Sequence, residues 1–153
     1  MDSSSDSIER TILLRAPRSR VWRALSDAEE FGSWFGVTVK AGRIAAGEHM
    51  SGQVTHPEYQ HVILHFDFEQ LEQDRLLSWR WHPAAVDPSV DYSKEPQTEV
   101  VFMLDDVEHG TLLTIIESGF DRVPAARRLE AFRMHNGGWD EQMRNIQAHV
   151  SKC

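Results

Sequence analysis

The C-terminal part of the chain, residues 124–150, has the pattern of one long helix with a single apolar face. Regularly spaced side chains alternate steps of three and four residues, which places them on one stripe. The stripe consists of Leu129, Phe132, Asn136, Trp139, Met143, Ile146 and Val150. Because all of these except Asn136 are apolar, the helix must pack against another layer, which the rest of the chain must supply.

Two adjacent glycines, Gly137 and Gly138, lie in the middle of this helix, just before Trp139. A glycine inside a helix costs about 1 kcal/mol relative to alanine. We therefore expect bare backbone to be needed there, either for close packing or for room beside the helix. A closing helix with room left under it indicates a pocket for a small molecule.

The region before this helix has the alternation with period two that is typical of strands. The expected strands are residues 8–15, 37–39, 52–55, 62–71, 76–82, 98–104 and 111–118. Two short helices are expected after the first strand, one beginning after Pro17 and the other with Asp27 as its N-cap. The order is strand, two helices, β-meander and long helix, which predicts an α+β fold with the last helix covering one face of an antiparallel sheet.

Length and charge limit the classes of protein to which the chain can belong. Its 153 residues fit a single domain, which we place at residues 8–151 after a short disordered tail, residues 1–7. The formal net charge of −8 argues against nucleic acid as a partner. No apolar run approaches the roughly 20 residues that span a bilayer, and the first residues do not have the pattern of a signal peptide. We therefore expect no membrane partner and a cytoplasmic location.

Metal and cofactor motifs are missing from the sequence. The single cysteine, Cys153, excludes a disulfide or a thiolate metal site within one chain. His61 and His65 would share a strand face about 13 Å apart, too far to hold one ion together. The chain has neither a phosphate-binding glycine loop nor a nucleophile elbow. We predict no metal and no cofactor.

The segment between two of the predicted strands, residues 83–97, is long and contains three prolines. Loops of this length in compact domains are usually either functional lids or disordered. Val90 and Tyr92 give this segment apolar surface to bury. We therefore predict an ordered lid.

Several short motifs occur in an order that resembles a known superfamily. They are residues 16–25 (APRSRVWRAL), 31–35 (FGSWF), 75–83 (RLLSWRWHP), 110–114 (GTLLT), 117–120 (ESGF) and 138–139 (GW). Together they resemble the START-like (SRPBCC) superfamily, and within it the AHSA-type branch related to activators of the heat-shock-protein-90 ATPase. The resemblance implies a helix-grip, Bet v-like fold, in which a curved antiparallel sheet wraps around a long C-terminal helix. The superfamily includes carriers of hydrophobic ligands, polyketide cyclases and co-chaperone modules.

The sequence departs from the pattern of this superfamily at two places. The Arg-rich Gly-Gly signature of many relatives is replaced by residues 45–48 (AAGE), and residues 83–97 are longer than in a minimal member. Because both segments would lie at the rim of a pocket, the identity of a ligand does not carry over from the superfamily.

Glu117 is the residue that most suggests chemistry. It continues the face of Leu113 and Ile115, so its carboxylate should point toward the core or a pocket. Desolvation would raise its pKa unless a cation or several donors compensate, and a carboxyl group of that kind can act as a general acid or base. The alternative is a structural role, in an ion pair or a hydrogen bond to an indole or a backbone amide.

Aromatic side chains suggest the walls of a cavity. Trp79 and Trp81 lie two residues apart on one strand, which places their rings on the same face about 6.6 Å apart. Such rings suit a flat apolar ligand, although plain core packing is the alternative. The predicted ligand-binding residues are Trp34, Phe66, Trp79, Trp81, Phe102, Glu117, Phe132, Asn136, Trp139 and Met143.

Three hypotheses for the function follow. The first is a protein that binds a small apolar or aromatic ligand between the sheet and the last helix. The second is a cyclase, dehydratase or hydrolase that uses Glu117 as acid or base, with a Trp, Tyr59 or Tyr92 positioning the substrate. The third, implied by the resemblance alone, is a regulator of a chaperone ATPase. The sequence is also compatible with a homodimer.

Overall fold

The computed structural model describes residues 6–40, 42–87 and 89–151. Its elements are β1 (Ser7–Leu14), α1 (Arg18–Ser26), α2 (Ala28–Phe35), β2 (Val37–Thr38), β3 (His49–Val54), η1 (Pro57–Tyr59), β4 (Ile63–Glu72), β5 (Leu76–Trp81), β6 (Thr98–Val107), β7 (Gly110–Ser118), η2 (Phe120–Arg122) and α3 (Ala125–Val150). Most of the predicted disordered tail, residues 1–5, lies outside the described residues, but Ser7 already belongs to β1.

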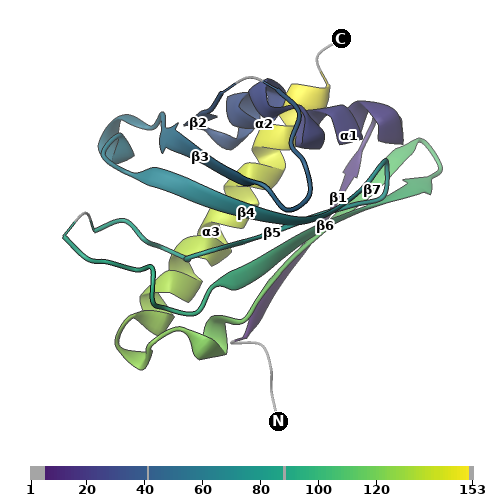
Figure 1. Ribbon diagram of the computed structural model, residues 1–153. Helices are drawn as coiled ribbons and strands as arrows, with labels where there is room; N and C mark the ends of the chain where they lie inside the picture. The colour runs from purple at the N-terminus through teal and green to yellow at the C-terminus, as the bar shows by residue number, and fades with distance from the viewer. Residues whose placement is uncertain (1–5, 41, 88, 152–153) are drawn as a thin grey trace.

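The seven strands form one antiparallel sheet in the order β1-β7-β6-β5-β4-β3-β2. The sheet curves around α3, while α1 and α2 lie beside the C-terminal half of that helix (Figure 1). This arrangement confirms the α+β helix-grip fold predicted from the sequence. No helix in the described part of the chain is long and apolar enough to cross a membrane.

The second short helix begins and ends as its sequence predicts. The side chain of Asp27 accepts a hydrogen bond from the backbone N–H of Glu30 at 3.0 Å, which satisfies one of the free donors of the first turn. Gly36 ends the helix with φ of 93°, a conformation that glycine adopts without strain. The short helix turns its aromatic side chains toward the sheet.

These aromatic side chains fill much of the interior between the sheet and α3. The rings of Phe31 and Phe35 lie 5.7 and 5.9 Å from that of Trp79, and the rings of Trp79 and Phe102 are 5.1 Å apart. Phe66 and Trp79 are fully buried. This part of the interior is therefore a packed core, which the sequence analysis had left as the alternative to a cavity.

The face of α3 that meets the core differs from the predicted stripe. Leu129 is 61% exposed, and Asn136 lies on the exposed side, where its Oδ1 accepts a hydrogen bond from Arg10 at 2.7 Å. The residues of the inward face are Ala131, His135, Trp139, Met143, Ile146 and Val150. The prediction was wrong for Leu129 and Asn136 because the N-terminal half of the helix is turned so that a polar residue, His135, faces the sheet.

The two glycines of α3 do not serve close packing. A Cβ atom built on Gly137 or Gly138 would meet no atom within 4 Å. The first of the two explanations offered by the sequence is therefore wrong. Room beside the helix remains as the explanation for Gly138, which borders the hollow described below.

An opening in the sheet positions the candidate site. The pairing of β4 with β5 runs from Asp67 opposite Arg80 to Glu72 opposite Leu76. The beginning of β4, residues 63–66, is therefore not paired with β5 and faces the segment that follows that strand. That segment is the long loop of residues 83–97, which leaves the sheet at this point (Figure 1).

Candidate functional site

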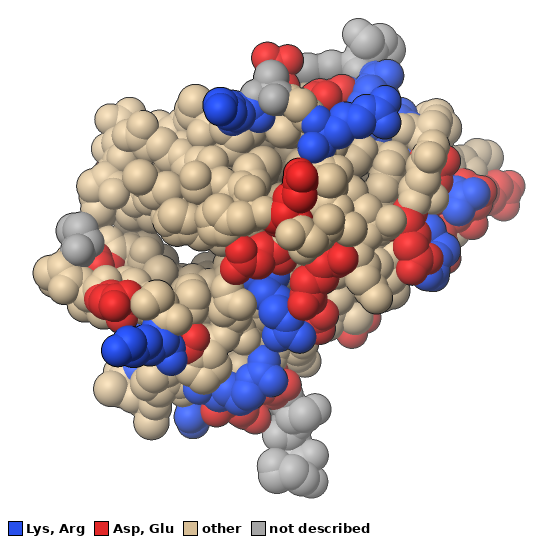
Figure 2. Space-filling view, viewed as in Figure 1, with Lys and Arg blue, Asp and Glu red and all other residues tan. Residues whose placement is uncertain are grey.

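Two adjoining hollows lie between β4, the 83–97 loop and α3, and we name them together the cleft. Their volumes are about 510 Å³ on the sheet side and about 200 Å³ on the helix side. Both are lined by Leu64, Trp81, His82, Ala85 and Val86. Figure 2 shows the surface hollowed between the beginning of β4 and the loop. The volume on the sheet side lies within the range of roughly 300–1,000 Å³ that is usual for small-molecule sites.

The helix side of the cleft has a mostly apolar lining. It is formed by Phe35, Leu64, Trp81, Ala84, Ala85, Val86, Met134, Gly138 and Trp139, with His82, His135 and Gln142 as its polar members. The rings of Trp81 and Trp139 lie 6.3 Å apart at an angle of 34°. Two large indoles inclined at a low angle form a wall that suits a flat apolar molecule.

Glu117 lies behind this wall and bonds to both of its indoles. Its Oε2 accepts hydrogen bonds from Trp81 Nε1 at 2.8 Å and Thr98 Oγ1 at 2.6 Å. Its Oε1 accepts from Trp139 Nε1 at 2.8 Å and His135 Nδ1 at 2.7 Å. The side chain is fully buried. All four lone-pair positions of the carboxylate are therefore used inside the protein.

These contacts determine the charge of Glu117. Burial raises the pKa of its carboxyl group, but His135 beside it and the hydrogen bonds from His135, Thr98 and Trp81 outweigh burial, so the pKa lies below its ordinary value. Glu117 is thus a carboxylate that holds Trp81 and Trp139 in place. These contacts are those of the structural role, with hydrogen bonds from indoles to a buried carboxylate.

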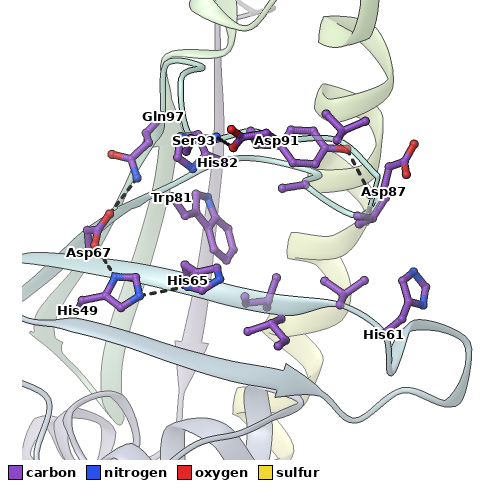
Figure 3. Close-up of a pocket in the computed structure, with 17 residues that line it drawn as sticks. His49, His61, His65, Asp67, Trp81, His82, Asp87, Asp91, Ser93 and Gln97 are labelled. Atoms are coloured by element: carbon purple, nitrogen blue, oxygen red, sulfur yellow. Dashed lines mark hydrogen bonds and ion pairs between the residues drawn. The ribbon is translucent and has the colours of Figure 1, made fainter.

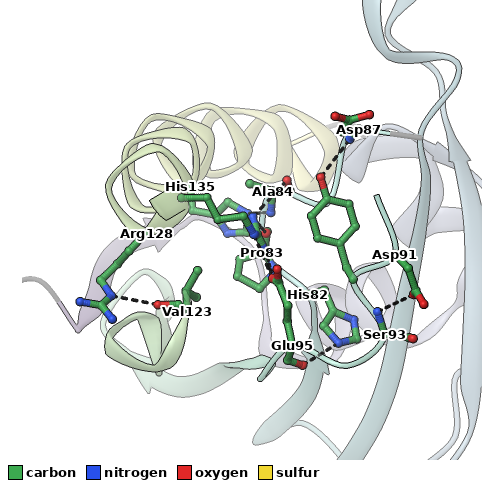
Figure 4. Close-up of polar contacts among 12 residues, drawn as sticks. His82, Pro83, Ala84, Asp87, Asp91, Ser93, Glu95, Val123, Arg128 and His135 are labelled. Atoms are coloured by element: carbon green, nitrogen blue, oxygen red, sulfur yellow. Dashed lines mark hydrogen bonds and ion pairs between the residues drawn. The ribbon is translucent and has the colours of Figure 1, made fainter. Parts of the chain in front are cut away.

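The 83–97 loop is tied to α3 by polar contacts (Figure 4). His135 Nε2 accepts a hydrogen bond from the backbone N–H of Ala84 at 3.1 Å. Arg127 donates to the carbonyl of Pro83 at 3.0 Å and to the carboxylate of Glu95 at 2.9 Å, and its guanidinium lies 4.7 Å from the ring centre of Tyr92. The loop is therefore held over the cleft by the N-terminal half of the last helix.

The sheet side of the cleft is polar. Asp67 Oδ1 contacts His49 Nδ1 at 2.7 Å, and His49 Nε2 contacts His65 Nδ1 at 3.1 Å (Figure 3). Asp67 Oδ2 accepts from the side chain of Gln97 at 2.9 Å, which ties the end of the loop to β4. Across residues 6–40, 42–87 and 89–151, no three His, Cys, Asp or Glu side chains are arranged to hold a metal ion.

The structure places the predicted site residues in three different environments. Trp81 and Trp139 line the cleft. The core or its edge contains Trp34, Phe66, Trp79, Phe102, Phe132, Met143 and, as the acceptor behind the wall, Glu117. Asn136 is exposed and lies outside the cleft lining.

Sequence reasoning missed several lining residues, above all His135 and the beginning of the loop. His135, Trp139 and Met143 follow one another at steps of four, which is a helical spacing that could have identified His135. No such local signal exists for Leu64 or Ala85, because they are distant in the sequence and only the folded chain brings them to the same cleft.

Comparison with protein families identifies one that covers almost the whole chain. The sequence pattern of the family described as "Activator of Hsp90 ATPase homolog 1-like protein" matches residues 15–151. Among curated proteins, no sequence is similar enough to count as a match.

Several solved structures share the fold. A protein from Arthrobacter aurescens superposes with a TM-score of 0.75 at 18% identity, over 100% of this chain and 90% of that one. A protein from Mesorhizobium loti gives 0.73 at 21% identity, over 95% and 97% of the two chains. The Aha1 dimer from Colwellia psychrerythraea gives 0.72 at 15% identity, over 95% and 96%. At these identities the likeness extends to the fold alone.

Proposed function

The chain belongs to the family of activator of Hsp90 ATPase homolog 1-like proteins, and within the fold of that family we propose that it binds a small, flat, apolar ligand in the cleft. The observation that carries this proposal is the pair of indoles, Trp81 and Trp139, which line the helix side of the cleft. The adjoining sheet side, with about 510 Å³, has the volume that is usual for a small-molecule site. Val86 of the loop lines the same hollow.

The network behind the wall supports binding because it makes the wall rigid. Each indole donates its N–H to a different oxygen of Glu117, so that neither ring can turn without breaking a buried hydrogen bond. Such a bond to a charged group is worth about 1.5–3 kcal/mol. A preorganised wall pays less entropy on binding than a mobile one.

The same network disfavours the enzyme hypothesis. A general acid or base must come within hydrogen-bond reach of the proton that it transfers. Both oxygens of Glu117 are enclosed and already accept two hydrogen bonds each. We therefore assign Glu117 a positioning role.

The glycine pair of α3 provides a test with a built-in control. Gly138 borders the cleft, whereas Gly137, its neighbour with equal space for a Cβ atom, does not. Gly138→Leu should weaken the binding of 2-methoxynaphthalene by about tenfold or more, a loss of about 1.4 kcal/mol or more. Gly137→Leu should leave the dissociation constant unchanged. Equilibrium dialysis measures both.

Both variants should fold, because leucine is the better helix former by roughly 0.8 kcal/mol. Equal or higher melting temperatures for the two variants would show that a loss of binding is local. The proposal is wrong if wild type does not bind the naphthalene, or if Gly138→Leu binds it as tightly as wild type does.

Two further properties are proposed from the relatives. The Colwellia psychrerythraea relative is described as a dimer, so we propose self-association, to be measured by light scattering at several concentrations. From the family description we propose that the chain acts on the Hsp90 ATPase, in the cytoplasm. A rise in the ATPase rate of a purified Hsp90 on adding the chain would support this action. A mass that stays that of a monomer would reject self-association. An unchanged ATPase rate would reject action on Hsp90.

A further inference from the structure

The polar side of the cleft contains a chain of hydrogen bonds that begins at the carboxylate of Asp67. Although partial burial raises the pKa of Asp67, hydrogen bonds from His49 and Gln97 outweigh that effect, and the pKa lies below its ordinary value. An ionised carboxylate only accepts hydrogen bonds, so His49 must carry its proton on Nδ1.

The direction then passes to His65. In the form of this chain of hydrogen bonds in which each histidine carries one proton, Nε2 of His49 is an acceptor and His65 donates to it from Nδ1. The Nε2 atom of His65 is left as an acceptor, and it has no hydrogen-bond partner among the residues that the structure describes. In Figure 3 the ring of His65 extends from His49 into the space beneath Trp81.

The charge state of His65 agrees with this assignment. Partial burial lowers its pKa below the ordinary value, and the neighbouring His49 and His82 lower it further, while Asp67 acts in the opposite sense. The ring is therefore neutral near pH 7.5, which keeps the lone pair on Nε2.

His82, on the opposite side of the hollow, is oriented in the same way. Its Nε2 lies 3.0 Å from the backbone carbonyl of Glu95, which can only accept, so Nε2 carries a proton; when the ring carries that proton alone, its Nδ1 is an acceptor. The carboxylates of Asp67, Asp87 and Asp91 also line this side, and neither lysine nor arginine is found among the described lining residues. This side of the cleft thus offers acceptors and negative charge.

We propose that the ligand of the cleft is a neutral aromatic molecule with a hydroxyl group, whose ring lies against Trp81 and whose O–H donates to Nε2 of His65. This inference rests on the proposed function and adds the chemical class of the ligand. A carboxylated or sulfonated aromatic is excluded by the same reasoning, because it would place an anion among Asp67, Asp87 and Asp91 without a cation to compensate.

The test compares three ligands with one ring system: 2-naphthol, 2-methoxynaphthalene and 2-naphthoate. At pH 7.5, 2-naphthol should bind about threefold to tenfold more tightly than the methyl ether, the value of one neutral hydrogen bond. The anionic naphthoate should bind most weakly of the three. Dissociation constants are measured by calorimetry on the full chain.

The variant His65→Leu should remove the preference for 2-naphthol over the ether while the ether still binds. His109→Asn is the control: His109 is also an exposed histidine, lies in the β6–β7 hairpin outside the lining of the cleft, and has a φ of 73° that asparagine tolerates. The control should keep the preference of wild type.

The outcomes separate the two proposals. Equal affinity of wild type for 2-naphthol and the ether, tighter binding of naphthoate, or an unchanged preference in a folded His65→Leu variant would overturn the assignment of the hydroxyl but leave the apolar cleft standing. Failure of all three ligands to bind would overturn both the cleft as a binding site and the class of ligand.

Discussion

Glu117 connects three parts of the protein that are distant in sequence: β5 through Trp81, the beginning of β6 through Thr98, and α3 through His135 and Trp139. Removing the charge leaves buried donors without a full partner, and each such group costs about 1–3 kcal/mol. We expect Glu117→Gln to lower the free energy of unfolding by about 2–3 kcal/mol. Urea unfolding of this variant and of Glu108→Gln, an exposed control, measures it. A loss below about 0.5 kcal/mol, the usual effect of a surface change, would contradict the network.

The same residue predicts a dependence on pH. The folded pKa of Glu117 lies below its ordinary value, so its contribution is complete above the unfolded pKa of about 4.3 and is lost as the pH falls through the folded pKa. The stability difference between wild type and Glu117→Gln should therefore stay constant from about pH 8 to pH 5 and shrink below about pH 4. Urea midpoints in stepped buffers test the sign: a difference that grows in acid would mean a raised pKa.

At the scale of elements, the existence of α3 was predictable but its rotation was only partly so. Trp139, Met143, Ile146 and Val150 lie inward as predicted, because an apolar face has one low-energy orientation. In the N-terminal half, His135 turns inward because Glu117, which is remote in sequence, offers it a partner. Only the tertiary structure could show that His135, and not Asn136, takes the inward position, because the partner of His135 lies on another element.

The 83–97 loop is the element for which the contacts make a prediction about motion. Arg127 holds Pro83, Glu95 and Tyr92 together. Arg127→Gln should speed hydrogen exchange of the loop amides by about tenfold, as expected for loss of about 1.4 kcal/mol of local stability. Amides of β6 and β7 should exchange as in wild type. Uniform acceleration over the whole chain would indicate global destabilisation instead, and Arg133→Gln, on the exposed face of α3, is the control.

For the whole molecule, the layers of sheet and helix could be predicted from the sequence, but the position of the cleft could not. Alternation within the strands, the N-cap Asp27 and the apolar half of α3 are local patterns, and they predict an α+β fold in which the last helix covers an antiparallel sheet. The helix-grip arrangement was implied by the family resemblance. The cleft arises where the pairing of β4 with β5 ends, at Asp67 and Arg80, and where the loop meets α3. Strand register and loop docking depend on residues that are distant in the sequence. The sequence therefore predicted a cavity near Trp79, whereas that part of the interior is packed and the cleft lies beside Trp81.

The central claim, that a flat apolar ligand lies against Trp81 and Trp139, is tested most directly by the indole N–H resonances of the five tryptophans. We predict that titration with 2-methoxynaphthalene shifts the signals of Trp81 and Trp139 in a saturable way, while the signal of Trp22, on α1, stays unchanged. If all the signals stay unchanged, or if that of Trp22 shifts as much as those of Trp81 and Trp139, the account is contradicted.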